Sequence, residues 1–266
     1  MLLTLSAGSF RSRLSRNGSG GMRVVDLPTF TIRELKLHGL NIPVSLLKGW
    51  STDQLEQLRD AADKASCPCL VLIEDTPLVM GSTDPQIKSK TSDRVKTLAL
   101  AANKLGCNSL ALKIDAPDSK ESFDRVVIEI KSLMPSIEKR ELNALIAPGK
   151  GLTESTERLT ELIKKVGGFR IGSLPSFGDA ARVGEGDPVE ALRKLAPYAG
   201  SIQATVEGFN KKGAHKSYDL AACVSAIRNV GFLNTLAIDY TGDDDELKGI
   251  AQAREILQAA IDAQES

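Results

Sequence analysis

The sequence predicts a (β/α)8 barrel that occupies residues 1–266 as a single domain. Eight β-prone runs alternate with helical patterns, and parallel neighbours need such a crossover, usually a helix. The length of 266 residues suits one α/β barrel, and no linker, charge block or low-complexity run divides it. A doubly wound open sheet is the competing architecture. It is disfavoured because Gly18, Gly20 and Gly21 precede polar loop rather than the start of a helix.

The predicted strands are short runs rich in aliphatic and β-branched residues. They are Leu2–Ala7, Leu40–Val44, Cys69–Ile73, Ser109–Ile114, Leu142–Ile146, Phe169–Leu174, Ser201–Val206 and Thr235–Tyr240. Pro43 indicates an irregular second strand, because proline cannot donate to the ladder. The continuous apolar run of the third strand indicates a strand that is covered on both faces.

Helices are predicted between the strands from apolar periodicity and from capping residues. They start at Leu27 and then cover Thr52–Ala65, Ser92–Leu105, Lys120–Ile137, Glu154–Val166, Asp187–Ala196, Tyr218–Val230 and Asp244 to about Ala263. Asp26 and Thr153 are expected to cap the helices that follow them. Pro135 is expected to interrupt its helix, and Phe177-Gly178-Asp179 is expected to lie in a loop.

Composition excludes several classes of function. Lys+Arg and Asp+Glu both total 34, so the net charge is zero, and this balance predicts neither a nucleic-acid nor a membrane partner. No run of 18 apolar residues occurs, so no bilayer span is expected. The amino terminus has no basic segment ahead of its apolar run, which indicates a first strand rather than a signal peptide. The four cysteines have no ligand spacing and are interpreted as reduced, buried thiols of a cytoplasmic protein.

The common catalytic motifs are missing from the sequence. It contains no P-loop, no G-x-S-x-G, no H-E-x-x-H and no C-x-x-C. Only His38 and His215 are available as imidazoles, and both are interpreted as structural or solvated. Two histidines are too few for a multi-zinc site that is built on imidazole ligands.

Several segments in order resemble one known family. They are LSAGSFRSRL, GLNIP, ELNALIAPGKGLTESTERLTELIKKVG, GSLPSFGDA, DPVEALRKLAPYAGSIQATVEGF and LAIDYTGDDDELKGIAQA. Together they resemble the xylose isomerase-like TIM barrels, which are sugar and sugar-phosphate isomerases and epimerases. The resemblance spans nearly the whole chain. The related DNA-repair endonucleases share the fold, but their zinc cluster needs histidines that this sequence does not have.

The resemblance implies a divalent metal at the barrel mouth, held by a Glu after strand five, an Asp after strand six, commonly a His on strand seven and a Glu on strand eight. The sequence departs at each position, with Ala147, Ser176, Gln203 and Asp239. Mg²⁺ and Mn²⁺ prefer hard oxygen ligands that include carboxylates. We therefore expect no cofactor at the standard metal site, which is degenerate. A relocated site that joins Glu74 or Asp115 to Asp239 is the alternative.

The candidate site residues lie where the strands enter their loops. Asp239 is the candidate catalytic base. The candidate substrate-binding residues are Arg11, Asn41, Lys113, Lys150, Ser176 and Gln203. Arg13 and Arg16 share the polar first loop with Arg11, and these arginines or Lys150 are candidates for binding a sugar phosphate.

Three functions remain open at this point. The first is a diverged isomerase-like barrel that binds a carbohydrate or sugar phosphate at its mouth without metal-dependent proton transfer. The second is an active isomerase or epimerase with a rearranged site, in which Asp239 is the base and Lys113 or Arg11 replaces the metal. The third is a non-catalytic structural or partner-binding barrel whose mouth is filled by side chains such as Phe177 and Phe209. The sequence predicts neither the substrate nor the oligomeric state.

Overall fold

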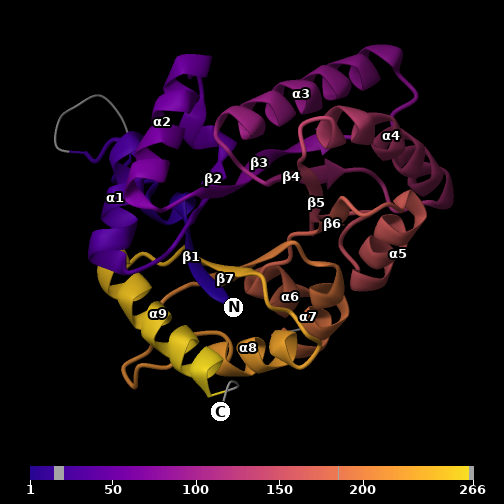
Figure 1. Ribbon diagram of the computed structural model, residues 1–266. Helices are drawn as coiled ribbons and strands as arrows, with labels where there is room; N and C mark the ends of the chain where they lie inside the picture. Colours follow the sequence, from indigo (N-terminus) through magenta and orange to yellow (C-terminus); the bar gives the residue numbers. More distant parts are fainter. Residues whose placement is uncertain (15–20, 185, 264–266) are drawn as a thin grey trace.

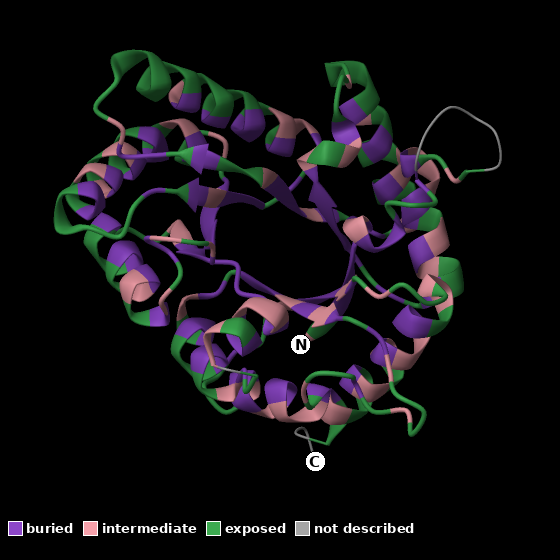
Figure 2. Cartoon of the chain, turned by 180° about the vertical axis from the view of Figure 1, so that it is seen from behind, coloured by how far each residue is buried: buried purple, intermediate pink, exposed green. Residues whose placement is uncertain are grey.

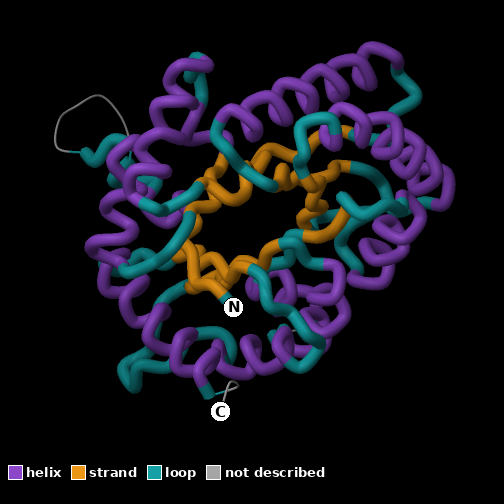
Figure 3. The backbone as a smooth tube through the Cα atoms, viewed as in Figure 1, coloured by secondary structure: helices purple, strands orange, loops and turns teal. Residues whose placement is uncertain are grey.

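The computed structural model describes residues 1–14, 21–184 and 186–263, and in these residues eight strands form one sheet (Figures 1 and 3). The strands are β1 (Leu2–Ser6), β2 (Leu40–Pro43), β3 (Cys69–Val79), β4 (Ser109–Asp115), β5 (Asn143–Ala147), β6 (Ile171–Ser173), β7 (Ser201–Val206) and β8 (Thr235–Tyr240). Their order is β6-β5-β4-β3-β2-β1-β8-β7, and every pair is parallel. This arrangement fits a TIM barrel, as the sequence predicts.

The two ends of this sheet, β6 and β7, meet along a short seam. Two isolated parallel bridges join them, between Ser173 and Ala199 and between Ser176 and Gln203. The Gly200 amide donates to the Ser173 carbonyl at 3.0 Å, and the Gln203 amide donates to the Pro175 carbonyl at 2.9 Å. The seam therefore closes the ring of strands with fewer regular ladder contacts than the other strand pairs have.

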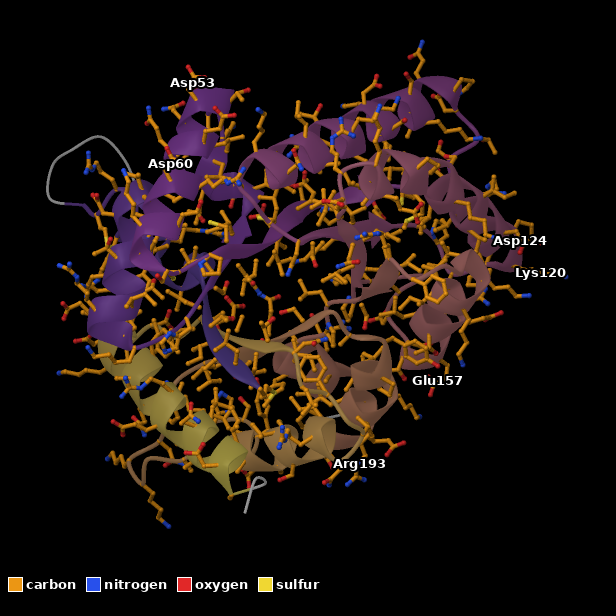
Figure 4. All side chains as sticks on the ribbon, in the orientation of Figure 1. Asp53, Asp60, Lys120, Asp124, Glu157 and Arg193 are labelled. Carbon is orange, nitrogen blue, oxygen red and sulfur yellow. The ribbon has the colours of Figure 1, made fainter. Side chains whose placement is uncertain are left out.

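Helices surround the ring of strands (Figure 3). They are α1 (Leu27–Phe30), α2 (Thr52–Ala65), α3 (Pro85–Lys104), α4 (Lys120–Glu138), α5 (Thr156–Val166), α6 (Phe177–Val183), α7 (Val189–Leu195), α8 (Leu220–Arg228) and α9 (Glu246–Asp262). Short helical turns occupy Ala7–Phe10, Val24–Asp26, Thr31–Leu35, Val44–Leu47 and Ala196–Tyr198. The charged side chains labelled in Figure 4 point outward from this layer of helices.

Local capping explains where two of these helices begin. Ser51 caps α2 in a capping box with Gln54, since each side chain accepts a hydrogen bond from the other residue's backbone amide. Asp84 caps α3, and Pro85 occupies its first turn. The predicted start of α3 at Ser92 is therefore wrong by about two turns, because the polar segment before Ser92 is an exposed helical face.

Three further predictions need correction. The N-cap of α5 is Ser155, which accepts from the Arg158 amide at 3.0 Å, and the Thr153 hydroxyl is buried instead. Phe177-Gly178-Asp179 is the first turn of α6 rather than a loop, because Ser176 caps it. Pro135 lies inside α4 without ending it. Its position in the last turn allows this, since the helix has only a few residues left to form.

Buried hydrophobic residues form two clusters. Figure 2 shows buried positions along the strands and on the helices around them. The larger cluster lies between the strands and the helices, and it includes Phe177, which is fully buried there. The smaller cluster fills the barrel interior with side chains from alternate strand positions. Its members are Val71, Ile73, Ala111, Leu145, Ala147 and Leu174. These interior positions fix which strand residues face the barrel axis.

Asp26 precedes α1, but its prediction as a cap is wrong, because its carboxylate makes no capping hydrogen bond and accepts from the Arg23 guanidinium instead. The remaining predictions concern cysteines, histidines and membrane segments. All four cysteines are buried and free, and burial raises the pKa of the Cys67 thiol to about 11 and that of Cys69 to about 12. His215 is buried rather than solvated, and its Nδ1 accepts from the Tyr218 amide at 3.2 Å. His38 is exposed. In the described ranges, no helix combines the length and the apolar character that crossing a bilayer requires.

Candidate functional site

The carboxyl ends of the strands place polar side chains around the barrel mouth. Lys113 lies two residues after the interior residue Ala111 on β4 and is the register partner of Ala147 on β5. Thr205 on β7 and Asp239 on β8 are register partners in the same way. Four of these strand residues are half-buried, whereas the residues directly before and after each of them in the sequence are buried. The four are Lys113, Gln203, Thr205 and Asp239. Their side chains therefore face the mouth and not the layer of helices.

Asp239 is the electrostatic centre of this mouth. Burial raises the pKa of its carboxyl, whereas a hydrogen bond from the Ser6 side chain and the charges of Lys113 and Arg11 oppose the rise. The carboxylate of Asp179 also faces Asp239 and favours its protonated form. The backbone at Gly8 adjoins the Asp239 carboxyl, since a Cβ at Gly8 would lie 3.8 Å from Oδ1. Three other segments of the chain, residues 6–11, β4 and α6, thus act on one carboxyl group.

Asn41 lies deeper in the barrel, beside Ser6, its register partner on β1. The side chain is fully buried, and neither its Nδ2 nor its Oδ1 has a hydrogen-bond partner among the described residues. The hydroxyl of Thr4, also on β1 and fully buried, has none there either. Buried polar groups without partners are rare, so these two side chains depart from the usual pairing of buried polar groups in a barrel interior.

Ser176 and Gln203 lie side by side across the seam between β6 and β7. The Ser176 hydroxyl is already engaged, because it accepts from the Asp179 amide at 2.9 Å and donates to Asp179 Oδ2 at 2.8 Å. Its role in the structure is to cap α6. Gln203 is half-buried, and its strand position faces the mouth.

The first loop adds one arginine to the rim. The Arg11 guanidinium lies 3.2 Å from Asp75 Oδ2 and donates to Ser45 Oγ, also at 3.2 Å. Arg13 pairs with Glu246 at the start of α9. Arg16 lies outside the described residues. Lys150 is exposed in the loop after β5, and no contact joins it to the other candidates within the described residues.

The residues at the expected metal positions do not fit a divalent ion. Ala147 offers no ligand atom, the Ser176 hydroxyl is committed to Asp179, and only Asp239 supplies a carboxylate. Lys113, the register partner of Ala147, brings a positive charge to the mouth instead. Within the described ranges, no group of three or more His, Cys, Asp or Glu side chains is arranged to hold a metal ion. Carboxylate-poor sites of this kind suit Mg²⁺ and Mn²⁺ badly.

The relocated metal site that joins Glu74 to Asp239 is wrong. Val71 and Ile73 on β3 face the barrel axis, so Glu74 faces the opposite side of the sheet. There it is fully buried and paired with Arg94 of α3. Asp115 is exposed at the end of β4 and belongs to no such group of ligands.

Sequence reasoning missed Ser6 and Asp179 as members of the mouth. The signal for Ser6 was available in strand parity, because it lies two residues from another inward-facing position. Asp179 was missed because its segment was interpreted as a loop. Phe209 packs beside His215, with ring centroids 6.3 Å apart, and contacts the outer core.

No protein-family model and no curated protein sequence matches this chain. Solved structures match it over nearly its full length. A D-psicose 3-epimerase from Clostridium cellulolyticum H10, solved with D-tagatose, is 14% identical, with coverage of 100% of this chain and 98% of its own and a TM-score of 0.74. An L-ribulose 3-epimerase is 12% identical, with coverage of 99% and 97% and a TM-score of 0.80. A xylose isomerase domain protein from Planctomyces limnophilus is 18% identical, with coverage of 98% and 96% and a TM-score of 0.71. At these identities the likeness establishes a shared fold.

Proposed function

We propose that this chain, which has the fold of the xylose isomerase-like TIM barrels, binds a carbohydrate-type small molecule at its mouth without metal-dependent proton transfer. The observation that carries the proposal is the polar rim at the strand ends, which stays partly accessible above the fully buried, unpartnered amide of Asn41. The rim consists of Lys113, Gln203, Thr205 and Asp239. The solved structures that resemble this chain include epimerases of D-psicose and L-ribulose, which is compatible with a sugar ligand. A ligand that displaces water from this rim must carry hydrogen-bonding groups.

The chemistry of the rim favours a polyol. Each sugar hydroxyl is both a donor and an acceptor, and so are the side chains of Asn41, Gln203 and Thr205. Asp239 and Lys113 add one acceptor and one cationic donor, and charge-assisted hydrogen bonds are the stronger kind. Arg11 is paired with Asp75, so in its present position it offers a phosphate only part of its guanidinium.

Saturation-transfer NMR with a panel of aldoses, ketoses and their phosphates tests this proposal. We expect at least one sugar to bind, with no loss of binding in EDTA. Asn41→Leu and Gln203→Leu should each weaken binding by about tenfold, the usual effect of losing a hydrogen bond to a buried ligand. Gln57→Leu, on the exposed face of α2, is the matched control. Binding that requires added Mn²⁺, or that is unaffected by both mouth variants, would contradict the proposal.

Proton exchange at a sugar carbon is the second candidate function. It is supported by Asp239, whose carboxyl has a raised pKa and faces the cation of Lys113. In this scheme Asp239 takes a proton from the carbon next to a carbonyl, and the Lys113 ammonium stabilises the negative charge that develops on the oxygen. Deuterium incorporation from D₂O into the bound sugar is the test. Its absence in every sugar that binds would remove this second candidate and leave the binding proposal intact.

A further inference from the structure

We propose that the chain has a second ligand site, outside the barrel mouth, that takes a small organic anion with an apolar, planar body. The site is a cavity of about 660 Å³ between β3, the turn Val44–Leu47, α2 and α3. Ligand pockets in proteins typically measure about 300–1,000 Å³, so the cavity is large enough for a small molecule. Figure 1 shows α2 and α3 beside β2 and β3, on the outer side of the ring of strands.

A buried carboxylate lies at the base of this cavity. Glu74 Oε2 accepts from Arg94 Nε at 2.7 Å and lies 2.5 Å from Arg94 Nη2. Glu74 Oε1 accepts from the Thr76 amide at 3.1 Å. Both carboxylate oxygens are therefore satisfied inside the protein. Two nitrogens on one edge of the guanidinium meet the same carboxylate oxygen, and this contact orients the guanidinium.

The opposite edge of that guanidinium is available to a ligand. The Arg94 side chain is 42% exposed, and Nη1 makes no hydrogen bond in the described part of the chain. An arginine held in this way offers directed N–H groups, which match a carboxylate or a phosphate.

The charges around the cavity favour an anion. Each acid that lines it has its own partner, since Glu74 pairs with Arg94 and Asp75 pairs with Arg11. Lys48 lines the cavity and is exposed, and it has no acidic partner among the described residues. The cavity therefore retains uncompensated positive charge.

Most of the other residues that line the cavity are apolar and would contact the apolar, planar part of the ligand. Leu47, Leu55, Leu72 and Leu98 are buried apolar residues, and Trp50 presents a half-buried indole. Aromatic faces bind flat rings by offset stacking and by burial of apolar area. An aryl carboxylate or an aryl phosphate combines the two features that this cavity recognises.

Trp50 makes the test specific, because it is the only tryptophan of the chain. The native protein is titrated with phenyl phosphate and with benzoate while Trp50 fluorescence, excited at the red edge of the tryptophan band, is recorded. Benzyl alcohol is the neutral control, and inorganic phosphate is the control without an apolar body. We expect a saturable change with at least one aryl anion and about tenfold weaker binding of both controls, the effect of losing one charge-assisted contact or the ring.

Variants show whether the fluorescence change comes from binding in this cavity. Arg94→Lys keeps the positive charge opposite Glu74 and removes the planar guanidinium with its directed N–H groups. Ala101→Phe fills the cavity and leaves the ion pair in place. Each should weaken aryl-anion binding by about tenfold or more, while Lys96→Gln, exposed on the same helix, should not. Circular dichroism confirms folding of each variant. Asn41→Leu, in the mouth, should leave this titration unchanged, so the outcome is independent of the sugar-binding proposal.

Three results would overturn the second site. The first is the absence of a saturable response with both aryl anions. The second is equal affinity for benzyl alcohol, which would show an apolar surface without anion recognition. The third is unchanged affinity in folded Arg94→Lys and Ala101→Phe, which would place the binding elsewhere.

Discussion

Single residues distinguish the mouth from the rest of the barrel. Below the rim, the interior is filled by aliphatic side chains such as Val71 and Leu145. At the rim, Lys113, Gln203 and Asp239 replace them and remain half-exposed. Apolar side chains at these positions would pack the interior more completely, so the polar rim lowers stability relative to a filled barrel. Such departures from good packing are typical of binding sites.

Asp239 gives a prediction with a defined pH dependence. Burial raises the pKa of its carboxyl above the ordinary value of 3.8. Between the unfolded and the folded pKa, the folded state holds a proton that the unfolded state has released. Stability therefore falls as the pH rises through this window, and the full penalty remains above the folded pKa. Asp239→Asn removes it, so we expect its free energy of unfolding at pH 7 to rise by about 1 kcal/mol.

Urea unfolding of this variant at several pH values provides the measurement. The gain should shrink as the pH falls, and it should vanish below the unfolded pKa, where both states are protonated. Asp124→Asn, exposed on α4, is the control and should show no such gain. An Asp239→Asn protein that is less stable than the wild type at pH 7 would contradict the assignment.

The Glu74–Arg94 pair gives a second prediction at this scale. Arg94→Ala leaves the fully buried Glu74 carboxylate without its cation, and we expect a loss of about 2–3 kcal/mol, because breaking a buried pair usually costs 3–5 and Arg94 is partly exposed. The double variant Glu74→Met/Arg94→Met should recover most of this loss. Thermal unfolding of the single and double variants measures both effects. A double variant no more stable than Arg94→Ala would show that the pair is not the cause.

At the scale of elements, the sequence predicts the strands better than the helix starts. β7, β8 and α2 have the predicted bounds, because regular alternation or a capping box marks their ends. β3 runs on to Val79, past its apolar run, and this extension of Glu74 to Val79 carries no β-type pattern. In the mouth, Asp239 and Lys113 were predictable from strand ends. The partnerless state of Asn41 and the outward direction of Glu74 were not, since both depend on strand register.

The start of α5 provides an element-scale prediction. Ser155 caps this helix, whereas the Thr153 hydroxyl is buried and has no partner among the described residues. Ser155→Ala should therefore destabilise the protein by about 1 kcal/mol, the usual cost of losing an N-cap. Thr153→Val, which removes only an unsatisfied hydroxyl, should be neutral or stabilising. Chemical denaturation of the two variants measures this contrast, and the reverse order would restore Thr153 as the cap.

At the scale of the whole molecule, the seam between β6 and β7 is the weakest part of the ring. β6 has only three residues, and isolated bridges rather than a ladder join it to β7. Two glycines permit the close approach there. A Cβ on Gly172 would lie 2.6 Å from the Tyr198 carbonyl oxygen, and a Cβ on Gly200 would lie 2.5 Å from Leu145 Cδ2.

These glycines give a whole-molecule prediction. Gly172→Ala meets backbone, which cannot move aside, so we expect it to cost about 2–3 kcal/mol. Gly200→Ala meets the end of a leucine side chain, which can change rotamer, so its cost should be smaller. Calorimetry on both variants tests this order. Equal costs would mean that the seam adjusts its backbone as easily as its side chains.

The same seam would couple sugar binding at the mouth to local opening of the barrel. Gln203 lies on one edge, and Asp179, which is hydrogen-bonded to Ser176, lies on the other, so a sugar that contacts both side chains would bridge the seam. Opening of the seam would break these contacts with the sugar. The opening therefore becomes less frequent as a larger fraction of the protein binds sugar. Deuterium uptake by amides of β6 and β7 should therefore slow as the sugar concentration passes its dissociation constant. Hydrogen exchange of the β6 and β7 amides can then be used to screen for the natural ligand.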